Sequence, residues 1–369
     1  MRPRLSRLTL RGFKTFRELE DFEPGRLTVL IGPNGAGKSN FISFFRLLSW
    51  ALVPPGQLQD YVARQGGASA LLHQGKLPAR EIEATLKLTT DAGVNEYRFR
   101  LFHGAGDTLV FADESFRFRR SNDNRPALSL GAGHKEPQLI SKAEEGNTPA
   151  RVILGMLRRI IVHQFHDTSP GARIRTKWDV EDGRWLKEDA GNLGSVLYRL
   201  QSADPKYYQR IVETIRLILP FFATFELQPE YGRVLLQWRE KGTDRIFNAS
   251  QAADGMLRAI ALVTLLLQPE RDLPDVLILD EPELGLHPYA IEVLAGLIRS
   301  AANHVQVMVA TQSVSLIDRF DPQDIVVTDR SGQESNLRRL GVDEFADWLR
   351  DYTLSELWEK NVLGGRPAH

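Results

Sequence analysis

The eight residues from Gly32 to Ser39 have the sequence GPNGAGKS, and they constrain the fold of this chain more than any other segment. They fit the pattern G-x-x-x-x-G-K-[ST] and lie between an apolar run, Leu27 to Ile31, and a segment with apolar residues at helical spacing, Ser39 to Trp50. A buried strand, a glycine turn and a helix in this order form a phosphate-binding loop. The sequence therefore predicts an α/β nucleotide-binding fold.

Each residue type in this loop has a chemical role. Glycines let successive backbone N–H groups turn toward phosphate oxygens, and Lys38 adds a cation at the β- and γ-phosphates. The Ser39 hydroxyl is suited to bind Mg²⁺, and Asn34 is placed to face the γ-phosphate. We expect ATP to contact Gly32, Pro33, Asn34, Gly35, Ala36, Gly37, Lys38, Ser39 and Asn40. The alternative is a glycine turn that binds nothing.

A second motif argues against that alternative. The apolar strand Val276 to Leu279 ends in two acids, Asp280 and Glu281. An acid at the end of a buried strand can bind Mg²⁺ through water, which is the role we predict for Asp280, and Glu281 can orient or deprotonate the attacking water. Solvated acids that merely follow a strand are the alternative, but two matching motifs in one chain support each other.

Short apolar strands alternate with helical segments, which is typical of a mostly parallel sheet covered by helices. Three segments with alternating apolar and polar residues predict an antiparallel β-meander. These segments are Glu81 to Thr90, Glu96 to His103 and Thr108 to Arg119. Residues 121–148 are rich in Gly, Pro, Asn, Lys and Glu without periodicity, so we expect a mobile loop there.

The later elements divide the chain into three expected parts. Residues 1–148 contain the phosphate loop, the meander and the mobile loop; 149–224 form a helical insertion; 225–369 contain the acidic strand and the C-terminal helices. In the third part we expect strands at 225–229, 234–239 and 306–310, and helices at 254–268 and from Pro288.

Composition excludes several other classes of site. The chain has 47 basic and 47 acidic residues, so no overall positive field indicates nucleic acid, although residues 117–125 could form a local basic patch. There is no Cys, and the eight His residues lack metal-binding spacing, which excludes thiolate and H-E-x-x-H metal sites. No apolar run approaches the roughly 20 residues of a membrane span. We expect a cytoplasmic protein without a membrane partner.

Several segments resemble known ATPases. The phosphate loop from Gly32 to Asn40 and the segment LILDEPELGLHP are similar to ABC-type ATPases of the RecF, SMC and OLD group. More narrowly, FHDTSPGARIR, LDEPELGLHPYAIEVLAGLI, VATQSVSLID and LSELWEKNVLGGRP resemble a bacterial family of stand-alone AAA_21 (AAA15-like) ATPases. The likeness covers nearly the whole chain and implies a P-loop NTPase head of ABC type.

The resemblance also implies that ATP lies between two heads, with a signature loop of one copy reaching the γ-phosphate held by the other. The candidate loop contains Ala253, Asp254 and Gly255 at the start of a helix. Relatives usually have serine where this chain has Ala253, so one hydroxyl donor is lost. Either turnover is slow, or the hydroxyl of Ser250 takes the place of the missing donor. A simple helix N-terminus is the alternative for this segment.

Two glutamines complete the implied site. Gln164 is similar to the Q-loop glutamine that joins Mg²⁺ and the attacking water to the helical part, although a glutamine near a strand end is commonplace, and His163 and His166 could be packed or surface groups. Gln312 stands where cassette ATPases generally have a switch histidine, and it can hydrogen-bond the γ-phosphate without accepting a proton. The connection Pro282 to His287 resembles a D-loop along the dimer seam; a plain αβ connection is the alternative.

Two functional hypotheses follow from the resemblance. The first is a Mg²⁺-dependent ATPase that dimerises with ATP and acts as a DNA-associated switch in repair or phage defence. The second is an ATP-gated scaffold that controls a separate effector protein with little turnover. A transporter subunit would be expected to have a fuller signature and a switch histidine, and a long-armed head would need sustained heptads, which the chain lacks.

Overall fold

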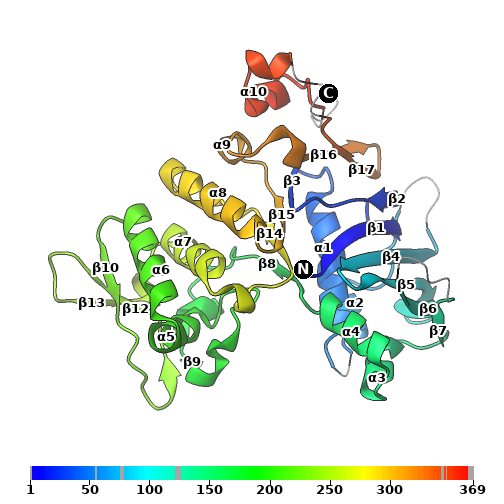
Figure 1. Ribbon diagram of the computed structural model, residues 1–369, viewed down its shortest axis with the longest axis horizontal. Helices are drawn as coiled ribbons and strands as arrows, with labels where there is room; N and C mark the ends of the chain where they lie inside the picture. The colour runs from blue at the N-terminus through cyan, green and yellow to red at the C-terminus, as the bar shows by residue number, and fades with distance from the viewer. Residues whose placement is uncertain are drawn as a thin grey trace. The chain divides into compact units, whose positions relative to one another are not determined.

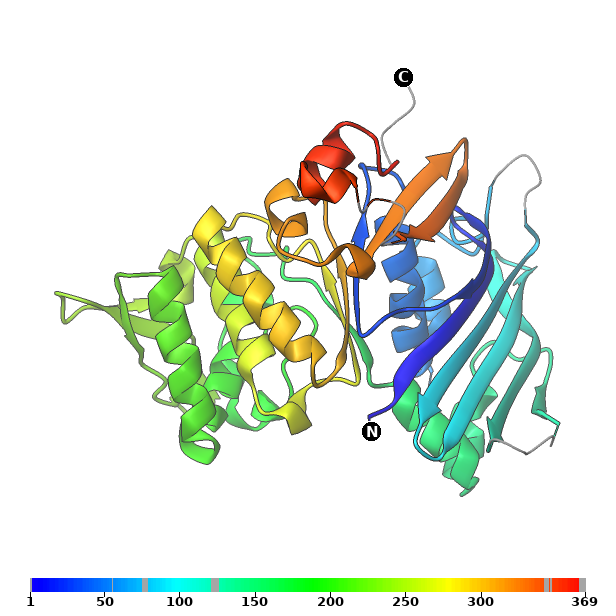
Figure 2. The ribbon, with the colours of Figure 1, turned by 45° about the horizontal axis from the view of Figure 1, so that its top comes forward.

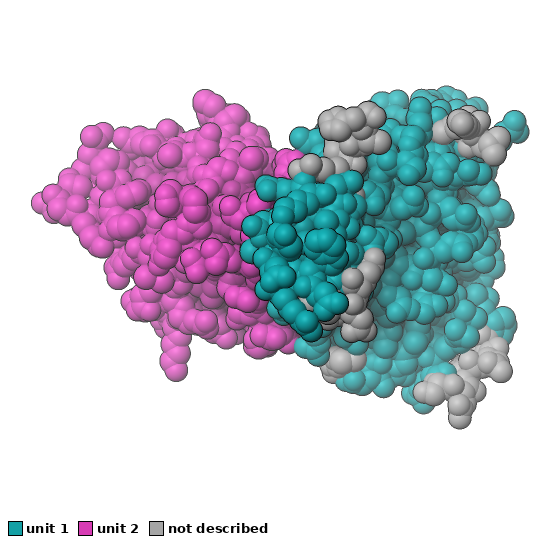
Figure 3. Space-filling view, turned by 90° about the horizontal axis from the view of Figure 1, so that it is seen from above, with its two compact units in different colours: residues 1–162, 274–278, 321–369 teal, residues 163–273, 279–320 magenta. Residues whose placement is uncertain are grey.

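The computed structural model describes residues 2–54, 56–74, 79–120, 126–341, 345 and 347–364. The chain has two compact units, distinguished by colour in Figure 3. Unit 1 consists of residues 1–162, 274–278 and 321–369, and unit 2 consists of 163–273 and 279–320. The three-part division at residues 148 and 224 stays a prediction.

Unit 1 contains an antiparallel sheet with the strand order β2-β1-β4-β5-β6-β7. Its strands are β1 (Arg4–Phe13), β2 (Phe16–Phe22), β4 (Glu81–Thr90), β5 (Gly93–Gly104), β6 (Thr108–Arg119) and β7 (Leu128–Gly131). Figure 2 shows β1, β4 and β5 side by side, as their hydrogen-bond registers require. The predicted meander is therefore confirmed, with β5 longer than expected because it begins at the Gly93 turn.

The expectation of a loop over 121–148 is wrong for much of that segment. Residues 121–125 lie outside the described residues, but β7 and helix α3 (Gln138–Glu144) follow them. The buried carboxylate of Glu114 accepts hydrogen bonds from the first N–H groups of α3, at Gln138 (2.8 Å) and Leu139 (3.1 Å). A distant side chain thus satisfies the helix terminus, which local composition cannot reveal.

The phosphate loop lies between β3 (Leu27–Ile31) and α1 (Lys38–Ala51), as predicted. All five β3 residues are buried, and β3 runs parallel to β16 (Ile325–Ser331), which in turn pairs antiparallel with β17 (Glu334–Arg339). The ring of Phe41 in α1 packs edge-on against Phe16 and Phe22 of β2, with centroids 6.0 and 5.5 Å apart. This aromatic cluster fixes α1 against the first hairpin.

The acidic strand, β14 (Val276–Asp280), extends from unit 1 into unit 2. In unit 1 it begins beside β8 (Ile160–His163), where the N–H groups of Asp275 and Val276 donate to Arg159 O. In unit 2 the residue directly after the strand, Glu281, donates from its backbone N–H to Ala310 O at the end of β15 (Gln306–Ala310) over 2.8 Å. Both strands were expected, and both are buried throughout.

Unit 2 is mainly helical. Its helices are α5 (Leu193–Ala203), α6 (Pro205–Ile218), α7 (Asp254–Leu267), α8 (Pro288–Ala302) and α9 (Val314–Ile317). Helices α6, α7 and α8 pack on one another (Figure 1). Eleven of the fourteen residues of α7 are buried, so its apolar run belongs to the core of the unit.

A three-stranded sheet, β10-β12-β13, and a two-stranded ladder, β11-β9, complete unit 2. The strands are β9 (Trp178–Asp179), β10 (Phe222–Phe225), β11 (Arg233–Val234), β12 (Gln237–Glu240) and β13 (Ile246–Asn248). The expected strand at 225–229 is wrong in position, because the buried rings of Phe222 and Phe225 start the pairing earlier. The expected strand at 234–239 is split between β11 and β12.

Three further helices belong to unit 1: α2 (Leu58–Arg64), α4 (Thr148–Leu157) and α10 (Leu354–Glu359). In the described part of the chain, every helix is too short or too polar to cross a membrane.

Candidate active site

The phosphate loop in unit 1 depends on glycines with left-handed backbone conformations. The φ angles of Gly35 and Gly37 are 78° and 118°. A Cβ atom on Gly37 would clash with the Oγ and Cβ atoms of Ser335, so a side chain there would meet β17 as well as strain the backbone. The tight turn that the motif predicts therefore requires glycine at these positions.

The loop is stabilised by residues that lie far away in the sequence. Ser335 donates from Oγ to Ala36 O over 2.6 Å, and Arg330 donates from Nη1 to Gly35 O over 3.1 Å. Both residues belong to the β16–β17 hairpin. Because this hairpin comes near the end of the chain, motif spacing did not identify it as a support for the loop.

Lys38 is held inside the turn. Its side chain is buried, and Nζ donates to the carbonyl groups of Gly32 (2.5 Å) and Pro33 (3.1 Å). These carbonyls keep the ammonium group within the loop, where it can also meet an entering phosphate. Ser39 is exposed and can reach a ligand, as can Asn34.

Asn40, the last of the expected ATP contacts, has a different neighbour in the structure. Its Nδ2 donates to Thr15 Oγ1 over 3.0 Å, which fixes the start of α1 to the turn between β1 and β2. A contact between Asn40 and ATP stays a prediction.

The two acids at the end of β14 differ in environment. Asp280 is buried, with 6% of its surface exposed. Glu281 has φ 44°, a left-handed conformation that is uncommon outside glycine. Such conformations cost about 1–3 kcal/mol and cluster at functional sites, where the surrounding structure maintains them. Here the hydrogen bond from Glu281 N to Ala310 O helps to maintain it.

Gln164 and His166 both contact Asp280. Gln164 donates from Nε2 to Asp280 Oδ2 over 3.1 Å, and His166 Nε2 lies 3.0 Å from the Asp280 carbonyl oxygen. His166 Nδ1 lies 2.8 Å from Gln164 Nε2, so this network assigns the ring proton to Nε2. The structure therefore brings Gln164 and Asp280 together, with His166 in contact with both, and the binding of Mg²⁺ by Gln164 and Asp280 stays a prediction.

Gln312 lies beside the second acid. It donates from Nε2 to Glu281 Oε1 over 3.2 Å. Its neighbour Thr311 donates from Oγ1 to Glu283 Oε1 over 2.5 Å. Burial raises the pKa of the Glu283 carboxyl, and the hydrogen bond from Thr311 partly opposes this shift. Two carboxylates thus meet one short turn after β15.

The signature-like loop begins α7 in unit 2. Ala253 is the N-cap of α7 and provides no side-chain cap. The side chain of Asp254 accepts a hydrogen bond from Arg175 Nη2 over 2.8 Å. Gly255 leaves no room for a side chain, because a Cβ atom there would clash with the carbonyl oxygen of Gly285. Close approach to the D-loop-like segment is therefore the reason for glycine at position 255.

Arginine side chains connect this loop to the chain that follows β8. Arg175 also donates from Nε to Thr168 O (2.8 Å) and from Nη1 to the carbonyl groups of Ala249 and Ala252. Arg258, one turn into α7, donates to Phe165 O over 3.1 Å and to the carbonyl groups of His166 and Leu284. The motif FHDTSPGARIR thus supplies the partners that fix the start of α7.

A family model described as "AAA domain, putative AbiEii toxin, Type IV TA system", AAA_21, matches residues 27–318. The chain belongs to the AAA_21 family. The match includes both the phosphate loop and the acidic strand, and it establishes this AAA_21 chain as a P-loop ATPase. No curated protein matches the sequence.

Solved structures agree on the fold of this AAA_21 ATPase. An SMC head bound to the C-winged helix domain of ScpA is similar at 16% identity and a TM-score of 0.61, over 93% of this chain and 99% of that one. An SMC head from Pyrococcus furiosus, bound to the C-terminal domain of ScpA, is 14% identical with a TM-score of 0.60, over 95% of this chain and 99% of that one. An SMC head from Pyrococcus yayanosii is 13% identical with a TM-score of 0.55, over 95% of this chain and 99% of that one. The predicted ABC-type P-loop fold is confirmed.

Besides the supports of the phosphate loop, sequence reasoning about this AAA_21 ATPase missed further contributors to the site. Arg175, Glu283 and Thr311 all occur in segments that the resemblance had already singled out, but spacing assigned them no role. Their significance depends on burial and on partners distant in sequence. The available signal was a charged or hydroxyl side chain inside a segment that resembles the family.

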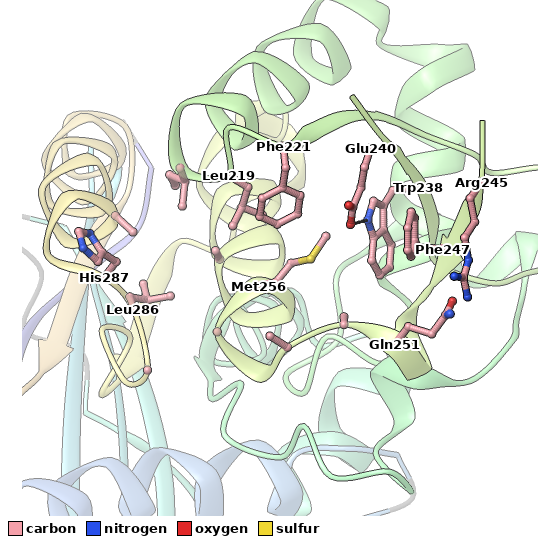
Figure 4. Close-up of a pocket in the computed structure, with 17 residues that line it drawn as sticks. Leu219, Phe221, Trp238, Glu240, Arg245, Phe247, Gln251, Met256, Leu286 and His287 are labelled. Carbon is pink, nitrogen blue, oxygen red and sulfur yellow. Dashed lines mark hydrogen bonds between the residues drawn. The ribbon is translucent and has the colours of Figure 1, made fainter. Parts of the chain in front are cut away.

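A pocket of about 510 Å³ opens in unit 2 beside the signature-like loop (Figure 4). Its apolar wall includes Leu219, Phe221, Trp238, Phe247, Met256 and Leu286. Ala252, Ala253 and Gly255 also contribute to the lining, so the signature-like loop has free space on one side.

Proposed function

We propose that this AAA_21 chain hydrolyses ATP with Mg²⁺ and works as a molecular switch whose two copies assemble head to head around the nucleotide. The observation that supports the proposal best is the hydrogen bond between Gln312 and Glu281. It holds the carboxylate expected to activate water against a side chain able to sense the γ-phosphate. A merely solvated acid at a strand end would need no such partner.

Different residues of this chain bind the phosphates and activate the attacking water. Backbone N–H groups of residues 32–39 and the Lys38 ammonium bind the phosphates. The Glu281 carboxylate orients the attacking water and accepts its proton, and Gln312 fixes that carboxylate. The carboxylate of Asp280 is oriented by the hydrogen bond from Gln164, and His166 contacts the backbone carbonyl of the same residue.

The residues present fit a magnesium ion. Among the described residues there is no group of three His, Asp or Glu side chains able to hold a metal. Mg²⁺ is characteristically bound through one or two carboxylates together with phosphate and water, so the Asp280 carboxylate is a suitable partner, and Ser39 and Gln164 offer further oxygens. When bound, Mg²⁺ neutralises charge on the β- and γ-phosphates.

Exposure of the loops supports a dimer. The Asp254 side chain is 59% exposed although Arg175 fixes it. Leu284 and Tyr289, in and after the D-loop-like segment, are large apolar residues that are 42% and 48% exposed. Apolar side chains at the surface beside a rigid polar loop are suited to a protein interface. We propose that ATP brings the loop of one copy to the nucleotide of its partner.

The role of the switch is proposed from the family. The family description names a putative toxin of a toxin–antitoxin system, which supports a defence role, and association with DNA is part of the same proposal. The second candidate is an ATP-gated scaffold for a separate effector protein. It is favoured by Ala253, since the N-cap of α7 has no side-chain donor or acceptor.

The test is Mg²⁺-dependent ATP turnover of the wild type and of Glu281→Gln, with oligomeric mass measured with and without ATP. Abolished turnover with an ATP-trapped dimer in the variant supports the proposal, and Lys38→Ala should lose ATP binding. ATP binding without any turnover in the wild type would favour the scaffold. A monomer under all conditions would contradict head-to-head assembly.

A further inference from the structure

Glu283 is a buried acid outside the motif residues that bind ATP or water. It lies in the connection from Pro282 to His287, and 8% of its surface is exposed. Burying a carboxyl group is costly unless it is hydrogen-bonded. Its partners therefore indicate what it is for.

The contacts of Glu283 lead into the turn after β15. Thr311 Oγ1 donates to Glu283 Oε1 over 2.5 Å, and the same Thr311 oxygen accepts from Ser313 N over 2.9 Å. Ser313 is the N-cap of α9, where its Oγ accepts from Leu316 N. Glu283 is thus linked through Thr311 to Ser313 and the start of α9.

The opposite side of this turn contacts Glu281. Gln312 reaches Glu281 Oε1 over 3.2 Å, and Ala310 O accepts from Glu281 N over 2.8 Å. The turn therefore lies between two acids, of which Glu281 is half-buried and Glu283 is buried. A shift of the turn would move Gln312 away from Glu281.

We propose that Glu283 is a positioning residue: through Thr311 it fixes the turn of residues 310–313, which holds Gln312 against Glu281. This inference rests on the proposed hydrolysis of ATP. Glu283 itself contacts neither nucleotide nor water in this role. Its loss should lower kcat and leave ATP affinity unchanged.

The experiment compares kcat, KM and ATP affinity of Glu283→Leu, Thr311→Val, the double variant and Glu283→Gln, which keeps an oxygen to accept from Thr311. The control is Glu292→Leu, an exposed acid on α8. Losing one buried hydrogen bond should lower kcat about tenfold in each single variant. The double variant should lose no more than a single one, and Glu283→Gln should lose less than Glu283→Leu. Three results would each overturn the proposal: an unchanged kcat in the single variants, a loss of kcat in the double variant equal to the product of the two single losses, or equal losses of kcat in Glu283→Gln and Glu283→Leu.

Hydrogen exchange at the Ser313 amide tests the same contact without turnover. Exchange should be faster in Glu283→Leu and Thr311→Val than in Glu283→Gln or the control, at unchanged melting temperature. Should the wild type prove unable to hydrolyse ATP, the proposed function fails, while exchange still decides the positioning role. Equal Ser313 exchange in all variants would overturn it.

Discussion

Arg175 donates a hydrogen bond from Nη2 to Oδ1 of Asp254 over 2.8 Å, and only 8% of the arginine side chain is exposed. Gln164 contacts Asp280 at the end of β14, and Arg175 lies in the segment that follows Gln164. The contact between Arg175 and Asp254 therefore links this segment to the signature-like loop. Both ends of this link lie in unit 2. A rigid connection between them would let one nucleotide site influence the loop offered to the partner.

Replacing Arg175 should therefore affect both stability and turnover. Arg175→Met leaves three carbonyl groups and the Asp254 carboxylate without their donor, so we expect a loss of roughly 2–4 kcal/mol in the free energy of unfolding. Denaturant unfolding and ATP turnover measure the two effects. The control is Arg173→Met, an exposed arginine of the same motif, whose ion pair with Asp189 should contribute little. Equal losses in both variants would show that the buried contacts are unimportant.

Gly255→Ala should displace the start of α7. The added Cβ would clash with the Gly285 carbonyl, so backbone has to move at an expected cost of about 1–3 kcal/mol. ATP-dependent dimer formation should weaken, as measured by mass with ATP. Gly296→Ala within α8 is the matched control, because a Cβ there meets nothing within 4 Å and should stabilise the helix. A dimer of normal affinity in Gly255→Ala would be evidence against the interface role.

Ala253→Ser tests whether the missing hydroxyl limits the rate. Serine at this N-cap should add about 1 kcal/mol to stability, and a donor toward the partner's γ-phosphate should raise kcat about tenfold or more. Steady-state turnover and thermal unfolding measure the two outcomes separately. The neighbouring change, Ala252→Ser, is the control and should not accelerate hydrolysis. Improved stability with unchanged kcat would restrict the role of position 253 to helix capping.

His163 should make stability depend on pH. Burial lowers the pKa of this imidazole from 6.5 to about 4. The unfolded chain then binds a proton more readily than the folded one between these values, so stability falls as pH decreases from 6.5 toward 4. The full effect is about 3 kcal/mol. Urea unfolding at several pH values measures how the free energy of unfolding depends on pH. Between pH 6.5 and 4 this dependence should be weaker for His163→Gln than for the wild type, and near pH 8 the imidazole should contribute no dependence in either protein. Parallel slopes would contradict a buried neutral histidine.

The sequence by itself determined the parts whose information is local. The glycines, Lys38 and Ser39 follow from a strand–turn–helix pattern, and Asp280 and Glu281 follow from an apolar strand that must end at the sheet edge. The resemblance added Gln164 and Gln312, and in the structure Gln164 contacts Asp280 and Gln312 contacts Glu281. Periodicity also predicted the meander almost to the residue.

Only the tertiary structure decided which distant side chains make these parts rigid. Residues 138–144 form a helix although their surroundings resemble a loop, because the Glu114 carboxylate accepts from the first backbone N–H groups and from Tyr97 (2.8 Å). Glu283 and Arg175 likewise acquire their roles from burial and from partners far along the chain. Hydrogen bonds between remote segments depend on how the chain packs, and local patterning does not record that packing.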